Sequence, residues 1–144
     1  MIRIMVNIRD FKDRLSDLAY RVCVESETEP PFSGKYVQPV HDGVFLCVGC
    51  HTALFYAQDQ YDSKSGWPSF TAPFEPDVVD YYEQITIPDM NSTLTKESGG
   101  VKRIEVRCAC CQSHLGHVFD DGPEPDRLRY CINSVALILE DELS

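Results

Sequence analysis

Apolar residues recur at helical spacing in one part of the chain, residues 10–22, where Asp10 precedes them as a candidate N-cap. The apolar positions are Phe11, Leu15, Leu18, Ala19 and Val22. We therefore predict a single amphipathic helix near the N-terminus. Residues 26–34 are polar and contain proline and glycine, so we expect them to form a loop.

The remainder of the chain has the pattern of a β protein, with short apolar or alternating runs separated by turn residues. Residues 78–87 are rich in β-branched and aromatic side chains and stop at Pro88, and residues 101–107 alternate between apolar and charged side chains. The predicted strands cover 44–48, 54–56, 78–87, 101–107 and 127–139. Because no internal repeat or linker is visible, we predict one mainly β, mostly antiparallel domain over residues 1–144, with residues 1–25 as an N-terminal helical extension.

The length and net charge of the chain exclude some classes of function. A chain of 144 residues is within the usual size of one domain and can bury a real core. The 23 acidic residues outnumber the 13 basic ones, and the formal net charge of −10 argues against binding of nucleic acid or docking on an anionic membrane. No apolar run approaches the ~18 residues of a transmembrane helix and no signal-peptide pattern is present, so we expect a cytoplasmic protein.

The seven cysteines are an odd number and cannot all close into disulfides. Two pairs have the Cys-x-x-Cys spacing, Cys47 with Cys50 and Cys108 with Cys111. Four thiolates satisfy tetrahedral zinc, and a zinc ion bound in this way contributes directly to folding. We therefore predict one structural zinc ion that ties two distant loops together.

Other interpretations of these cysteines stay open. Cys110 could replace Cys111 as a ligand, although the spacing of the first pair favours Cys111. His114 and His117 could supply a nitrogen ligand, but four thiolates already fill the coordination shell. Cysteines that are buried or redox-active without any metal are the less favoured interpretation, because two matching pairs are present.

Cys131 lies within the predicted strand 127–139, with Arg129 and Asn133 two positions away on either side. Side chains alternate along a strand, so these three share one face. A neighbouring cation lowers a thiol pKa, and we therefore expect Cys131 to ionise near neutral pH and to act as a nucleophile. The simpler interpretation, a small buried apolar residue, fits poorly with polar neighbours on the same face.

Two further segments supply candidate partners for this thiol. His114 and His117 follow the second cysteine pair, and either imidazole could serve as an acid, a base or a hydrogen-bond donor to oxygen. Taken singly, each histidine is more often a structural hydrogen-bonding group. Trp67 is the only tryptophan, and it is either a core aromatic or one wall of a pocket.

Together these motifs resemble the peptide-methionine (R)-S-oxide reductases, the MsrB family. The matching segments occur in the family's order and cover about residues 17–139. They are TEPPFSGKY at 28–36, the two Cys-x-x-Cys pairs, SGWPSF at 65–70, HLGHVFDDGP at 114–123 and RYCINS at 129–134.

The resemblance implies two antiparallel β-sheets with short outer helices and a structural zinc ion remote from the chemistry. The implied zinc ligands are Cys47, Cys50, Cys108 and Cys111, and the implied nucleophile is Cys131. Trp67 is expected against the substrate methyl group, and His114, His117 and Asn133 on the polar side of the site. We add Phe119 and Arg129 to the expected substrate-binding residues. Selectivity for the R epimer comes from the resemblance alone.

The implied reaction is repair of methionine sulfoxide in proteins or peptides after oxidative stress. We expect the Cys131 thiolate to attack the sulfoxide sulfur while a histidine or its bound water protonates the oxygen. Methionine then leaves and Cys131 becomes a sulfenic acid, which condenses with a thiol to form a disulfide. Thioredoxin or a similar thiol reductant is expected to restore the enzyme, which we take to be a monomer.

Two positions depart from the family pattern. Ser65 occupies the position of a common resolving cysteine, so we take Cys23 as the first candidate for that task, Cys110 as the second, and direct reduction of the sulfenic acid as the third possibility. Gly99 stands where the family often has a histidine, which puts any substrate contact from that loop in doubt. Residues 83–97 match the pattern poorly.

The sequence pattern is less consistent with two alternative functions. A non-catalytic, zinc-stabilised binding module retains the cysteine pairs but leaves Arg129, Cys131 and Asn133 without a purpose on one strand face. A thioredoxin-like oxidoreductase requires a strand–helix setting around one Cys-x-x-Cys pair, and the pattern contains none.

Overall fold

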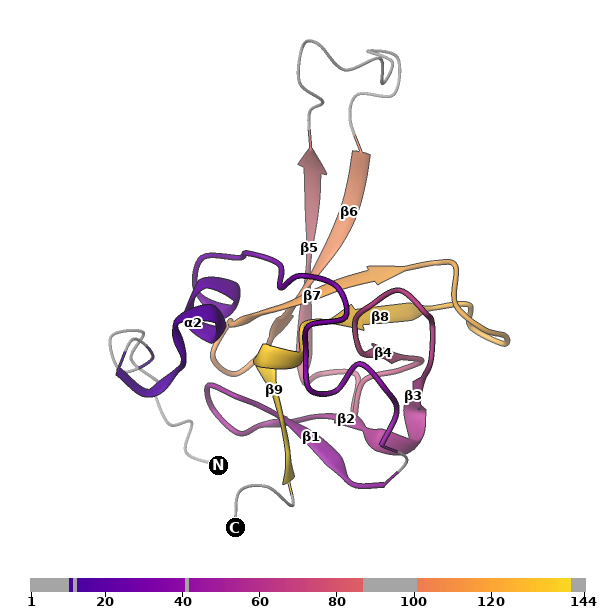
Figure 1. Cartoon of the computed structure of the whole chain (residues 1–144). Coiled ribbons are helices and arrows are strands. Elements are labelled where there is room, and N and C mark those ends of the chain that lie inside the picture. The colour runs from indigo at the N-terminus through magenta and orange to yellow at the C-terminus, as the bar shows by residue number, and fades with distance from the viewer. Residues whose placement is uncertain (1–10, 12, 41, 87–100, 141–144) are drawn as a thin grey trace.

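The computed structural model describes residue 11 and residues 13–40, 42–86 and 101–140. Nine strands form two antiparallel sheets in this described part (Figure 1). The strands are β1 (Val44–Cys47), β2 (Ala53–Tyr56), β3 (Gln60–Tyr61), β4 (Ser69–Phe70), β5 (Val79–Thr86), β6 (Val101–Cys108), β7 (His114–Phe119), β8 (Arg129–Ile132) and β9 (Leu137–Leu139). The predicted mainly β, antiparallel architecture is therefore confirmed.

The smaller sheet has the order β2-β1-β9, and the larger has the order β3-β4-β8-β7-β6-β5. Their facing sides bury the core of the molecule, which is rich in aromatic rings. Phe55 stacks on Phe70 with ring centroids 4.4 Å apart, and Phe45 meets Phe70 edge to face at 5.4 Å. Phe45 and Phe55 belong to the small sheet and Phe70 to the large one, so these ring contacts join the two sheets.

The helix α2 (Asp17–Cys23) begins later than the apolar pattern predicts. Phe11, Asp13 and Arg14 are helical, but the chain bends at Leu15. Ser16 then caps α2, with its side-chain oxygen accepting a hydrogen bond from the Ala19 amide at 3.1 Å. A serine in this position competes with continuous helix, which explains the interruption. The predicted cap at residue 10 lies outside the described residues.

The predicted strand over 127–139 is wrong in one respect, because this segment contributes to both sheets. β8 belongs to the large sheet, a 3-10 turn η3 (Ser134–Ala136) follows, and β9 then pairs with β1 in the small sheet. The change of direction occurs at Asn133, whose side-chain amide donates a hydrogen bond to the Leu115 carbonyl at 2.9 Å. A side chain that bonds the neighbouring strand in this way ends the regular ladder after Ile132.

β5 and β6 form a long two-stranded arm that projects beyond the rest of the large sheet (Figure 1). β5 pairs with β6 along its full length, from Val79 to Thr86, whereas β7 pairs only with residues 104–107 of β6. The backbone of residues 84–86 and of their partners at 101–103 therefore has no pairing with β7. The base of this arm lies beside the pocket described next.

Candidate functional site

The four cysteines of the two Cys-x-x-Cys pairs converge on one point. All four sulfur atoms lie within 4.8 Å of one another, with Cys47 and Cys111 separated by 3.6 Å and Cys50 and Cys108 by 3.5 Å. Sulfur atoms bound at about 2.3 Å to one tetrahedral ion are about 3.8 Å apart, so the spacing fits zinc. Cys110 is exposed and is not part of the cluster, so the Cys111 interpretation is the one that the geometry supports.

Two similar turns present these sulfur atoms. His51 donates its amide hydrogen to the Cys47 carbonyl and Gln112 donates its own to the Cys108 carbonyl, both at 2.8 Å. Both of these residues have a left-handed backbone, with φ of 62° at His51 and 65° at Gln112. One turn follows β1 in the small sheet and the other follows β6 in the large sheet, so a metal bound here would join the two sheets.

Hydroxyl groups next to the cluster suit thiolate ligands. Thr52 Oγ1 lies 3.0 Å from Cys50 Sγ, and Ser113 Oγ lies 3.1 Å from Cys111 Sγ. Hydrogen bonds with neighbouring thiols, first of all Cys108, lower the pKa of Cys111 to about 7. Four convergent sulfur atoms with hydroxyl neighbours are the features of a metal-binding site, and the four residues therefore fit the predicted zinc ion.

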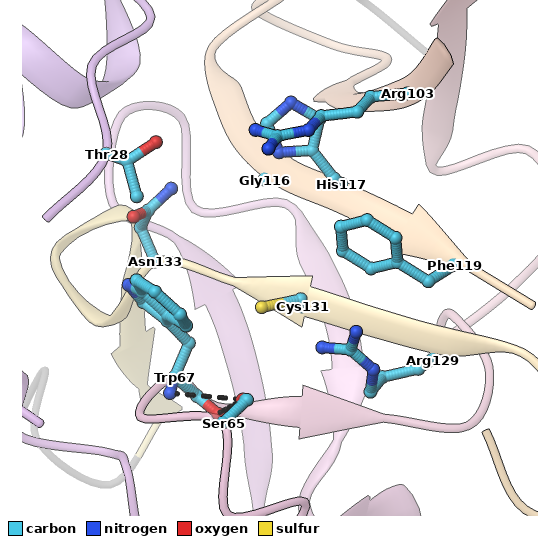
Figure 2. Close-up of a pocket in the computed structure, with 10 residues that line it drawn as sticks. All are labelled: Thr28, Ser65, Trp67, Arg103, Gly116, His117, Phe119, Arg129, Cys131 and Asn133. Carbon is cyan, nitrogen blue, oxygen red and sulfur yellow. Dashed lines mark hydrogen bonds between the residues drawn. The ribbon is translucent and has the colours of Figure 1, made fainter. Parts of the chain in front are cut away.

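A separate pocket of about 250 Å³ opens on the large sheet (Figure 2). Its lining combines aromatic, cationic and amide side chains around one thiol. The lining residues are Thr28, Ser65, Trp67, Arg103, Gly116, His117, Phe119, Arg129, Cys131 and Asn133. Six of the predicted catalytic and substrate-binding residues are therefore together in one pocket, and none of the four clustered cysteines lines it.

Strand register explains why these side chains meet. Cys131 on β8 pairs with His117 on β7, and Arg129 pairs with Phe119 two positions away. Cross-strand partners lie on the same face, so all four side chains point to the pocket side of the sheet. In Figure 2 the Cys131 sulfur points toward the indole of Trp67, which enters from the loop before β4.

The environment of Cys131 differs from expectation in one respect. Burial raises the pKa of the Cys131 thiol above its usual value, and the charge of Arg129 and a hydrogen bond from Ser65 only partly oppose this. The prediction that Cys131 ionises near neutral pH is therefore wrong for the resting protein. The sequence showed the neighbouring cation but not the loss of solvent around the sulfur, which is the larger effect.

His117 is a neutral histidine at physiological pH. Its Nε2 lies 2.9 Å from the side-chain oxygen of Gln84 on β5, which fixes the direction of the ring. Burial, followed by the charges of His114 and Arg103, lowers the pKa of His117 to about 4. The imidazole can therefore accept a proton in the pocket but does not hold one at rest.

His114 is buried behind His117 and does not line the pocket. The two rings are 5.4 Å apart between centroids. His114 Nδ1 lies 2.6 Å from Glu105 Oε2, and the other oxygen of Glu105 pairs with Arg107 at 2.9 Å. This arrangement gives His114 a supporting position beneath His117, and the catalytic role predicted for it stays a prediction.

Asn133 and Trp67 are both tied to the backbone of Glu29. The Asn133 oxygen accepts a hydrogen bond from the Glu29 amide at 3.0 Å, and the Trp67 indole donates one to the Glu29 carbonyl at 3.0 Å. The Glu29 side chain is itself buried and accepts a hydrogen bond from the Val135 amide at 2.9 Å. One loop residue thus holds the indole and the amide on the same side of Cys131.

Arg129 is held between two groups. It donates two hydrogen bonds to Asp121, at 2.8 and 3.1 Å, and its guanidinium lies 4.4 Å from the centre of the Phe119 ring. These contacts fix the cation beside Cys131, where its charge lowers the thiol pKa.

Cys23, the first candidate for a resolving cysteine, is not at the pocket. Only 4% of its surface is exposed, at the end of α2 and within the apolar core. Burial, with the nearby charge of Cys111, raises the pKa of Cys23 to about 12. Cys23 is therefore an unreactive thiol in this conformation, on the side of the metal cluster.

Sequence reasoning did not select three pocket residues, Thr28, Arg103 and Gly116. Thr28 and Gly116 belong to segments that match the family pattern, but neither has the side chain of a typical nucleophile, acid or base. Arg103 alternates with apolar residues on β6, and this pattern is equally typical of a solvated strand face. Only the pairing of β6 with β7 brings Arg103 to the pocket.

Comparison with known proteins gives two findings. A family model described as the SelR domain matches residues 15–141. The peptide methionine sulfoxide reductase MsrB of Teredinibacter turnerae (strain ATCC 39867 / T7901) is 41% identical over 139 residues, which cover 94% of each of the two chains.

Proposed function

Because the chain belongs to the MsrB family, whose members contain the SelR domain, we propose that it reduces peptide methionine-(R)-sulfoxide with Cys131 as the nucleophile. The observation that carries this proposal is the position of the Cys131 thiol, in one pocket with the Trp67 indole, the His117 imidazole and the Arg129 guanidinium. The methionine sulfoxide side chain has a terminal methyl group, an electrophilic sulfur and an oxygen that is a strong hydrogen-bond acceptor. Trp67 suits the first, Cys131 the second, and His117 with Asn133 the third.

The proposed reaction step needs no proton from outside the pocket. The Cys131 sulfur attacks the sulfoxide sulfur, the sulfur–oxygen bond of the substrate breaks, and the oxygen is transferred to Cys131. The cysteine sulfur loses two electrons and the substrate sulfur gains them, which yields methionine and a cysteine sulfenic acid. The thiol proton ends on the transferred oxygen.

Neutral His117 is the group that we expect to carry this proton. Burial raises the pKa of the Cys131 thiol, and its cross-strand partner His117 is neutral at rest, so it holds no proton that would block the transfer. A base next to the thiol lets the thiolate form only as the attack proceeds. Arg129 assists, because its fixed charge favours the thiolate over the thiol.

We further propose that an external reductant attacks the sulfenic acid directly. Ser65 is in the pocket but has no thiol, and Cys23 would have to leave the core before it could reach Cys131. One reductant thiol forms a mixed disulfide with Cys131 and releases water, and a second thiol then releases Cys131 as the free thiol. We propose thioredoxin, a dithiol, as the source of both thiols. The corresponding setting is a reducing compartment such as the cytoplasm, with the enzyme as a monomer.

The four-cysteine cluster is proposed to hold one structural zinc ion. Zinc bound to four thiolates has no open position for substrate, so it supplies folding free energy rather than catalysis. This proposal agrees with the location of the cluster outside the pocket.

The decisive assay offers both sulfoxide epimers of a short peptide to the intact protein and to Cys131→Ser. We expect turnover of the R epimer by the intact protein only, with bound zinc equal in both proteins. Turnover of the S epimer alone, or activity that survives the substitution, contradicts the proposal.

The route of reduction is tested by Cys23→Ser. We expect unchanged turnover with thioredoxin and no internal disulfide after a single turnover in either protein. If a disulfide forms in the intact protein and disappears in Cys23→Ser, Cys23 is the resolving cysteine and the direct route is wrong.

A further inference from the structure

Arg103 is an exposed cation at the rim of the catalytic pocket. It lies on β6 opposite Gln84 of β5, and Gln84 is the residue that holds the His117 ring. In Figure 2 its side chain extends toward His117 above the floor formed by β7 and β8. The effect of its positive charge on His117 agrees with this closeness.

The other charged groups around the pocket have partners. Arg129 forms two hydrogen bonds with Asp121, and Glu105 is shared between Arg107 and His114. Arg103 forms no ion pair with any carboxylate in the described ranges 13–40, 42–86 and 101–140. Among the described residues it is therefore the cation of the pocket without a carboxylate partner.

The reaction itself gives Arg103 no task. A sulfoxide is neutral, and Arg129 already supplies a positive charge beside Cys131. A methionine sulfoxide side chain that enters the pocket leaves its own backbone and the adjacent residues at the rim. The group that best matches an unpaired guanidinium there is a carboxylate, which can accept two parallel hydrogen bonds from it.

We propose that Arg103 binds a carboxylate next to the methionine sulfoxide in the substrate, so that the enzyme prefers oxidised methionines with acidic neighbours. This inference rests on the proposed reductase function. The protein has a net charge of −10, which disfavours acidic substrates at long range. Arg103 offsets that repulsion locally, at the position where flanking residues lie.

The test compares three peptides that differ only in the two residues that flank methionine-(R)-sulfoxide. Both flanking residues are aspartate in the first peptide, alanine in the second and lysine in the third. The quantity measured is kcat/KM for the intact protein and for Arg103→Glu. An exposed ion pair contributes up to about 1 kcal/mol, equal to about a fivefold preference. We expect the intact protein to prefer the aspartate peptide over the lysine peptide by a few fold, and Arg103→Glu to reverse that order.

Arg127→Glu is the matched control, because it makes the same change in net charge. Arg127 is exposed, pairs loosely with Glu124 at 3.9 Å and does not line the pocket. This variant should keep the order of the intact protein. High salt should abolish the preference in the intact protein, since exposed charges are screened within about 10 Å at 0.1 M and more strongly above that concentration.

The source of the carboxylate is resolved by two further peptides with a C-terminal methionine sulfoxide, one with a free carboxylate and one amidated. If the intact protein prefers the peptide with the free carboxylate and Arg103→Glu does not, the main-chain carboxylate is a second ligand of Arg103. If the intact protein reduces both peptides at equal rates, Arg103 binds only acidic side chains. An equal aspartate-to-lysine ratio in the intact protein and Arg103→Glu overturns the inference. Failure of the intact protein to reduce any peptide instead overturns the reductase function.

Discussion

Gly116 on β7 is the position where fold and chemistry are most closely coupled. It pairs with Ile132, and a Cβ atom added there would lie 2.0 Å from the carbonyl oxygen of Cys131. Carbon and carbonyl oxygen in contact are usually about 3.3–3.6 Å apart, so β7 and β8 would have to separate by more than about 1 Å. No side-chain rotation can relieve this contact, because the atom that it meets belongs to the backbone.

We therefore predict that Gly116→Ala is damaging in two measurable ways. Overpacking of this kind costs about 1–3 kcal/mol of unfolding free energy. Displacement of a nucleophile by about 1 Å reduces its rate by about a hundredfold. Urea unfolding measures the first effect, and kcat/KM on a methionine-(R)-sulfoxide peptide measures the second.

Gly122→Ala provides the comparison. Its added Cβ would lie 2.2 Å from the Leu128 carbonyl oxygen, a similar backbone collision in the turn between the same two strands but not at Cys131. We expect a comparable loss of stability with less than a tenfold loss of kcat/KM, as a rough bound from the smaller displacement of the thiol. If Gly116→Ala loses stability but keeps kcat/KM within about threefold of the intact protein, backbone position at Gly116 does not control the thiol and the reasoning fails.

Two further predictions concern metal and pH. Removal of the proposed zinc ion by a chelator, or Cys47→Ser, should lower the unfolding free energy by several kcal/mol, because an ion bound to the four cysteines would join both sheets; a metal-depleted protein with an unchanged urea midpoint would argue against this. The pKa of His117 is lowered from 6.5 to about 4, so the unfolded chain binds more protons than the folded protein between those values. Stability should therefore fall as the pH decreases from 6.5 to 4, and His117→Asn should flatten that part of the profile, which urea titrations at several pH values measure.

Much of the architecture was predictable because its signals are local. Strand composition and turn residues located β1, β2, β5 and β6 to within a few residues. The spacing within each cysteine pair predicted which four cysteines would cluster, because one turn presents two sulfur atoms whatever the rest of the chain does. The pocket members on β8 followed from strand alternation in the same way.

Other features depend on contacts between distant residues and could not be predicted. β7 was not predicted as a strand, because its histidines and glycine have no clear β pattern and it is stabilised by pairing with β6 and β8. The point at which the chain leaves the large sheet, at Asn133, depends on a hydrogen bond from the Asn133 side chain to the Leu115 carbonyl. The raised pKa of Cys131 depends on burial, which neighbouring residues in the sequence do not reveal.

The separation of the sulfur atoms into a four-cysteine cluster and a pocket with one thiol has a consequence for how the protein ages. In the proposed reaction each cycle would oxidise Cys131, which lies outside the cluster, so repeated turnover need not weaken the scaffold. Oxidation of the clustered cysteines would have the opposite effect, because an ion bound by them would be lost together with its link between the two sheets. Oxidation of the cluster should therefore end activity through loss of the fold, whereas over-oxidation of Cys131 should end activity with the fold intact.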